Sequence, residues 1–137
     1  MKITALLFTV LFVAISCSSH DSDDKPVVYN YYGNWINVVD AKDIDNPYVF
    51  RESYKFNRDK TFTKTRIHGN VTTTASGTFE VSANEIGTNL KLTYPTDNML
   101  ILNCSNSLIE TLTITKAGLL DNDGRMCDAE STYEKTK

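Results

Sequence analysis

The chain of 137 residues is predicted to be all-β, an antiparallel up-and-down meander closed into a barrel of about eight strands. First, short segments rich in β-branched and aromatic residues recur at regular spacing over residues 27–137. Second, turn-forming residues separate these segments. Third, no segment has a clear helical period; the nearest, 39–46, is too polar to assign. Sequential hairpins favour a meander, and closure removes the exposed sheet edges.

The elements follow from alternation and from turn residues. Strands are expected at 33–39, 49–57, 61–68, 71–81, 90–94, 99–104, 108–116 and 126–135. Turns are expected at 57–60, 69–70, 82–84, 95–98 and 121–124, where Asn, Asp, Gly, Pro or Ser gather. Within 108–116, the alternation predicts that Leu108, Leu112 and Ile114 face the core.

The N-terminus has the pattern of a secretory signal. Lys2 precedes an apolar run, Ile3–Ile15, which is shorter than the roughly 20 residues that a membrane span needs. The segment Ala14-Ile15-Ser16-Cys17 resembles the end of a bacterial lipoprotein signal. That resemblance implies removal of residues 1–16 and attachment of fatty acyl chains, palmitate among them, to Cys17. The alternative is an ordinary signal peptide with an incidental cysteine.

Residues 17–26 are expected to form a lipidated, acidic tether before a single domain at 27–137. Ser18 follows the cysteine, where retention in the inner membrane usually requires Asp, so an outer-membrane location is expected, periplasmic or surface-exposed. The acidic run Asp21-Ser22-Asp23-Asp24 resembles the surface-export tether of some lipoproteins. A solvated linker explains the same composition.

Charge and cysteine content narrow the function classes. The net charge of −3 argues against a nucleic-acid partner, which needs a basic face. Two cysteines besides Cys17 occur, Cys104 and Cys127, and an exported protein meets an oxidising compartment where they can pair. Two buried free thiols are the alternative.

Several motifs, in their order and spacing, resemble the small lipocalin-like lipoproteins of bacteria. They are Gly33-Asn34-Trp35, the hairpin 54–63, the segment 77–82 followed by 90–93, and the terminal Tyr133-Glu134-Lys135. The resemblance implies a lipocalin-like barrel over nearly all of the domain. It also implies a structural role for Trp35, closing one end of the barrel under an Arg or Lys of the last strand, whereas stacking on a ligand is the alternative.

The hairpin 49–68 holds the candidate binding residues. If Phe56 faces Phe62, antiparallel pairing sets Tyr54 opposite Lys64 and Glu52 opposite Arg66, with His68 further along the same face. Inside the barrel, these five residues would form a polar ligand site above an apolar floor. The alternative, favoured by the rarity of buried charges, is a solvated cross-strand ion pair on strands that extend past the rim.

No cofactor, metal site or catalytic set is predicted, and the protein is expected not to be an enzyme. The segment 119–130 only half-fits a calcium loop, because Leu119 stands where the first Asp belongs. Asp40, Asp43 and Asp45 are explained as solvated turn residues.

The expected function is a non-catalytic binding module, anchored to the membrane through its N-terminal lipid, for a small hydrophobic or glycan ligand. The alternative is a structural or accessory lipoprotein with a packed barrel that binds a protein partner. A sizeable lumen with converging polar groups would favour the first, and a lumen filled with aromatic side chains the second.

Overall fold

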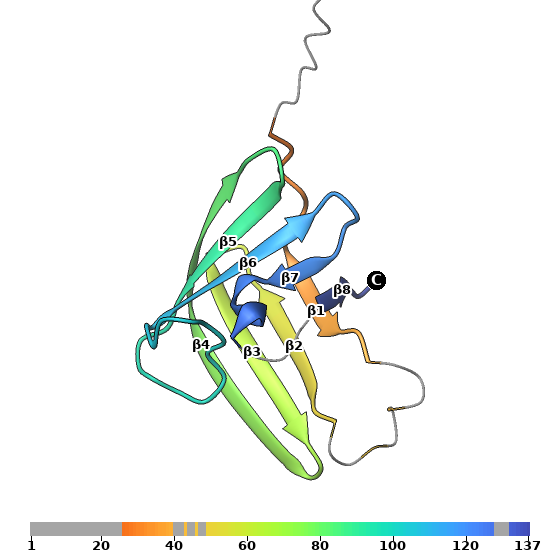
Figure 1. Ribbon diagram of the computed structural model, residues 1–137, viewed down its shortest axis with the longest axis vertical. Coiled ribbons are helices and arrows are strands. Elements are labelled where there is room, and N and C mark those ends of the chain that lie inside the picture. The colour runs from red at the N-terminus through yellow and green to blue at the C-terminus, as the bar shows by residue number, and fades with distance from the viewer. Residues whose placement is uncertain (1–25, 40–42, 44–45, 47–48, 128–131) are drawn as a thin grey trace, which may run out of the picture.

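A computed structural model describes residues 26–39, 43, 46, 49–127 and 132–137. In these ranges eight strands form a closed barrel (Figure 1). The strands are β1 (Gly33–Asn37), β2 (Arg51–Phe56), β3 (Thr61–His68), β4 (Val71–Ala83), β5 (Gly87–Thr93), β6 (Ile109–Thr115), β7 (Leu120–Asn122) and β8 (Thr132–Lys135). Each strand pairs antiparallel with the next, and β8 pairs with β1. The predicted up-and-down meander is confirmed.

The β2–β3 hairpin has the predicted register. Phe56 pairs with Phe62, Tyr54 with Lys64, and Glu52 with Arg66. Because side chains alternate along a strand, these six residues share the inner face of the barrel. Strand β3 then continues to His68, whose side chain is exposed beside the Gly69–Asn70 turn. Charged residues of the hairpin therefore enter the lumen, and the end of β3 around His68 is exposed.

Two expected elements are wrong, and a third, the strand expected at 126–135, is wrong at its start, because Met126 ends a 3-10 helix, Cys127 lies in a turn and β8 is Thr132–Lys135. Residues 99–104 form no strand; they belong to the long β5–β6 connection, which covers one end of the barrel and buries Leu100 completely. The turn expected at 121–124 is instead the end of β7 and the start of a 3-10 helix, η2 (Asp123–Met126). Tertiary contacts explain these two differences. Backbone groups of residues 99–104 bond buried side chains instead of a neighbouring strand. The segment expected as a turn pairs as β7 between β6 and β8.

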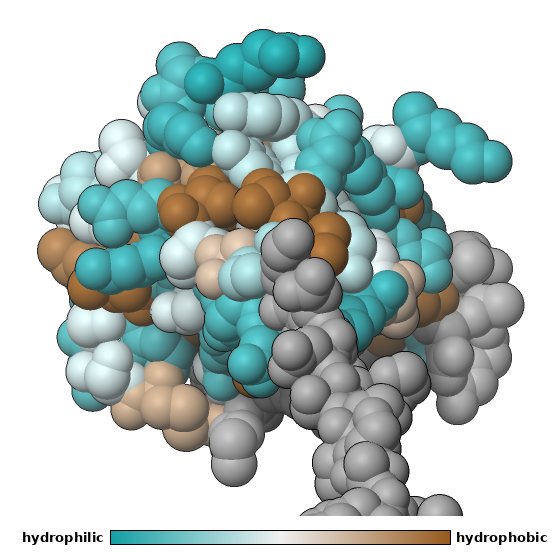
Figure 2. Space-filling view, turned by 90° about the horizontal axis from the view of Figure 1, so that it is seen from above, coloured by the Kyte–Doolittle hydropathy of each residue, from teal (hydrophilic) through white to brown (hydrophobic). Residues whose placement is uncertain are grey.

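The opposite end of the barrel, here the closed end, is filled with aromatic rings. Trp35 is 2% exposed and donates its Nε1–H to the carbonyl of Tyr31 at 2.9 Å. Lys135 of the last strand places its Nζ 5.9 Å from the centroid of that ring. Phe79 packs edge-on against both Tyr31 and Phe56. Residues 26–32 cross this end, which Figure 2 views from above.

A disulfide joins Cys104 to Cys127, with their Cα atoms 5.4 Å apart. It ties the β5–β6 connection to the segment that follows η2. In the described ranges, no helix has both the length and the apolar character needed to cross a bilayer. Cys17, the apolar run before it and residues 18–25 of the acidic tether lie outside the described residues.

Candidate functional site

An ionic cluster occupies the barrel above the aromatic floor. Lys64 from β3 lies between two carboxylates, with its Nζ 3.2 Å from Glu52 Oε1 and 2.8 Å from Glu110 Oε1. All three side chains are fully buried. The ammonium also donates to the carbonyl of Leu100 at 2.6 Å, so the β5–β6 connection is bonded directly to the cluster.

Buried hydroxyl and amide groups complete the shell around the two carboxylates. Glu110 accepts hydrogen bonds from the hydroxyls of Tyr54 (2.8 Å) and Tyr94 (2.5 Å) and from Asn122 Nδ2 (2.6 Å). Glu52 accepts one from the hydroxyl of Tyr133 at 2.5 Å. No described buried side-chain nitrogen or oxygen lacks a partner. A fully bonded cluster is what permits charged groups to stay in a desolvated interior.

The tyrosines of the cluster act as neutral donors. Burial raises the pKa of Tyr54 well above its usual value, and the negative Glu110 raises it further. Burial and the same carboxylate also raise the pKa of Tyr94. Both hydroxyls therefore keep their protons at neutral pH and can donate to Glu110.

Arg66 balances the charge of the cluster at its outer edge. Its Nε donates to Glu52 Oε2 at 2.6 Å, so two cations face two carboxylates. The Arg66 side chain is 20% exposed, whereas Glu52 is fully buried. The interpretation of this pair as a solvated surface ion pair is therefore wrong. It fails because Glu52 points into the lumen, where water is excluded.

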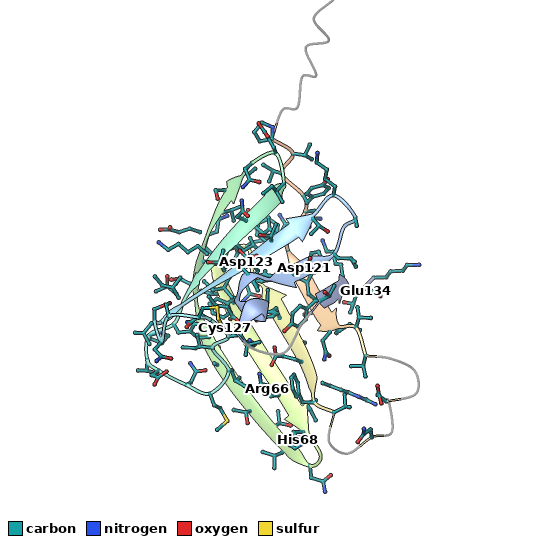
Figure 3. The ribbon with its side chains drawn as sticks, viewed as in Figure 1. Arg66, His68, Asp121, Asp123, Cys127 and Glu134 are labelled. Carbon is teal, nitrogen blue, oxygen red and sulfur yellow. A yellow bond between two sulfur atoms is a disulfide. The ribbon has the colours of Figure 1, made fainter. Side chains whose placement is uncertain are left out.

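Outside this pair lies a pocket of about 360 Å³, here called the mouth pocket. Its lining residues are Phe50, Arg66, His68, Val71, Thr73 and Met99. The Arg66 guanidinium carbon lies 4.5 Å from the centroid of the Phe50 ring. Figure 3 shows Arg66 and His68 along the β3–β4 hairpin, with His68 near its tip. The pocket joins two basic residues to apolar walls.

The predicted site residues divide between the cluster and the pocket. Glu52, Tyr54 and Lys64 lie in the cluster, Arg66 belongs to both, and His68 lies only at the pocket. Sequence reasoning missed four members, Glu110, Tyr94, Tyr133 and Asn122, as parts of this cluster. The signal for Glu110 was present in the alternation, because it lies between Leu108 and Leu112 on the same face. Leu108, expected inside, is 39% exposed.

In the segment 119–130, which half-fits a calcium loop, two acidic side chains bond neighbouring hydroxyl groups. Asp121 accepts a hydrogen bond from the Thr132 hydroxyl at 2.9 Å, and Asp123 accepts one from Thr113 at 3.2 Å. Figure 3 shows both acidic residues beside β7 and η2, away from the mouth pocket. In the part of the chain that the structure describes, no three His, Cys, Asp or Glu side chains converge to hold a metal ion.

A second hollow lies on the outer surface of the barrel. It measures about 490 Å³ and follows the outward faces of β1, β2 and β3. Ile36 and Ile67 line it, and they are 47% and 43% exposed. This surface is here called the outer groove, and its lining also includes Glu52 of the ionic cluster.

Comparison with protein-family models, with curated proteins and with solved structures finds no match to this chain.

Proposed function

We propose that this protein is a lipid-anchored, lipocalin-like lipoprotein of the outer membrane and a non-catalytic binding module whose ligand occupies the mouth pocket. The observation that carries the proposal is the Arg66 guanidinium, stacked on Phe50 at a pocket of about 360 Å³ and fixed by buried Glu52. A cation held in one orientation beside an apolar wall is a common recipe for a selective small-molecule site.

The site favours a ligand that binds outside the lumen. Leu90, Leu112 and Tyr133 are fully buried, as are Lys64 and Tyr54, so side chains fill the barrel interior. The mouth pocket offers two basic residues, Arg66 and His68, together with apolar surface. The matching ligand is small, carries an anionic or acceptor oxygen group, and has an apolar face. Such a ligand would stack beside Phe50 and bond the guanidinium.

The fluorescent dye anilinonaphthalene sulfonate has this chemistry and serves as the probe. We expect the folded protein to bind the dye, and the variant His68→Ala to bind it measurably more weakly. Arg66→Gln should weaken binding about tenfold, as expected for loss of a charged hydrogen bond. Lys55→Ala, on the outer face of β2, is the matched control and should bind as the parent does. Equal affinity of all three variants would rule out the mouth pocket as the dye site.

The anchor has a separate test. A Cys17→Ser variant should leave the membrane fraction and appear in soluble form with the same thermal unfolding and the same dye affinity. Acyl chains give stable anchoring only when two or more are present, so loss of the acylated cysteine should release the domain. Retention of the variant in the membrane fraction would contradict the lipoprotein proposal.

The second candidate function is an accessory lipoprotein that binds a protein partner, and the outer groove favours it. A partner that covers Ile36 and Ile67 would bury two large exposed side chains next to a filled barrel. The variant Ile67→Asp separates the two candidates. If the mouth pocket is the ligand site, the variant should bind the dye as the parent does. If the outer groove is the binding surface for a protein partner, the variant should no longer capture that partner.

A further inference from the structure

We infer that the closed end of the barrel is the membrane-facing surface of the anchored protein and rests on an anionic lipid bilayer; this inference rests on the proposed lipid anchor. Its core is an apolar patch at the start of the described chain. Val27, Val28 and Ile86 are 56%, 63% and 68% exposed. Pro26 and Ile86 line one shallow hollow, so the chain start and the β4–β5 turn lie together.

The patch is fixed to the barrel. The Thr88 hydroxyl donates to the carbonyl of Val27 at 3.0 Å, and the backbone N–H of Tyr29 donates to the same hydroxyl at 2.8 Å. Thr88 is fully buried at the start of β5. Figure 2 looks onto this end and shows hydrophobic side chains gathered near its centre. The apolar residues are therefore presented on a fixed surface.

Three basic side chains lie at the same end of the barrel as the patch. Lys60 bonds the Tyr31 hydroxyl at 2.7 Å, and the Arg58 guanidinium lies 5.5 Å from the Tyr32 ring centroid. Lys116 is exposed on the β6–β7 turn, next to the end of β6 that pairs with Gly87. The acidic residues Asp59 and Glu85 lie on the turns of this end too. Exposed apolar residues together with an excess of basic over acidic side chains at one end are the combination that binds the interface of an anionic bilayer.

The geometry of the anchor supports this orientation. Pro26 is nine positions after Cys17, which limits the tether to roughly 30 Å at full extension. The mouth pocket is at the other end of β4, whose 13 residues span about 43 Å. Figure 1 shows the β3–β4 turn and the described chain start at opposite ends. Contact through the closed end leaves the mouth pocket directed away from the lipid.

Depth-dependent quenching tests the inference on the full lipidated chain. An environment-sensitive fluorophore is attached at Ile86→Cys or, as the matched control, at Met99→Cys, a residue of the mouth pocket that is 77% exposed. Both proteins are placed in phosphatidylglycerol–phosphatidylethanolamine vesicles that carry spin-labelled lipid. We expect the label at position 86 to be quenched several-fold more than the label at position 99. High salt or Lys116→Glu should reduce that quenching.

Each outcome identifies what failed. Comparable quenching at the two positions, or stronger quenching at position 99, would overturn the closed-end contact. Mass spectrometry of the same samples reports the acyl chains. A chain that lacks acyl groups and does not float with the vesicles contradicts the anchor itself, and with it the inference that rests on it.

Discussion

The two ends of the barrel are built from opposite chemistry. At the closed end, Trp35, Phe56 and Phe79 exclude water through apolar contact, and the first two lie on neighbouring strands of one sheet. At the other end, Lys64, Glu52 and Glu110 are equally buried but are held by charge and by hydrogen bonds. Apolar packing is non-directional and tolerates small shifts, whereas a buried ionic cluster requires every partner to be in place.

The difference explains where a ligand can act. The interior of the closed end is filled with aromatic rings, and its exposed charged residues Arg58, Asp59, Glu85 and Lys116 lie on turns. At the ionic end, buried Lys64 and partly exposed Arg66 both pair with Glu52, and Arg66 reaches the mouth pocket. The cluster thus fixes the orientation of Arg66, the cation that solvent can reach. Burying the charged groups costs desolvation energy, and the fixed guanidinium is what the binding site gains from it.

The largest expected effect is at the centre of the cluster. Lys64→Met leaves two buried carboxylates with too few cations, and we expect a loss of about 3–5 kcal/mol in the free energy of unfolding. Urea denaturation measures it. The matched control is Lys55→Met on the outer face of β2, which should change stability by less than about 0.5 kcal/mol.

A double variant tests whether charge balance is the cause. Lys64→Met combined with Glu110→Gln again has one cation, Arg66, for one carboxylate, Glu52. The double variant should therefore recover part of the stability that Lys64→Met loses, so that the two substitutions are not additive. A loss equal to the sum of the single losses would show that packing, not charge, accounts for the effect.

The closed end should respond differently. Ile114 is 1% exposed and pairs with Thr88 and Leu120. Ile114→Ala removes buried methyl groups, and we expect a loss of about 2–5 kcal/mol. Because no charge is involved, the loss measured by denaturation should be the same at low and at high salt. A strong salt dependence would show that the two ends are not chemically separate.

The disulfide is expected to stabilise the ionic end by about 3 kcal/mol, the value the chain-entropy model gives for a loop of this size. The double variant Cys104→Ser, Cys127→Ser should lose that stability and should loosen the β5–β6 connection over Lys64. Amide hydrogen exchange measures this loosening residue by residue. We expect faster exchange at Leu102 and unchanged exchange at Trp35. Uniform acceleration over the whole barrel would contradict a local role.

The smallest expected effect concerns a tyrosine hydroxyl and carries a pH dependence. Tyr94→Phe removes one donor to Glu110 and should cost about 1–3 kcal/mol at neutral pH. The pKa of Tyr94 is raised in the folded protein, so its contribution is fully present below the unfolded value of about 10 and is lost as the pH rises further. Stability of the parent should fall above about pH 10, and less steeply in Tyr94→Phe. Identical slopes would exclude this tyrosine as a cause.

Alternation predicted most of the fold and half of the cluster. The β2–β3 pairing placed Glu52, Tyr54, Lys64 and Arg66 on one face, because register within a tight hairpin is a local property. The partners of Lys64 on distant strands could not be found in this way. Glu110 is 46 residues from Lys64 in the sequence, and only barrel closure brings them together.

The β5–β6 connection shows the limit of a propensity argument. Residues 99–104 have the apolar character of a strand, yet their backbone groups bond Lys64 and Glu110 instead of a neighbouring strand. The side chain of Leu100 is fully buried. This segment has the composition of a strand, but its backbone groups bond buried charged side chains. Those side chains come from distant parts of the sequence, so a propensity argument could not find them.

An amide NMR titration with anilinonaphthalene sulfonate tests the central claim most directly, that the ionic end orients a ligand site at the mouth pocket. We predict the largest shifts at Arg66, His68 and Thr73, with little change at Trp35 or Ile114. Shifts confined to Ile36 and Ile67 would place binding in the outer groove and would contradict the account.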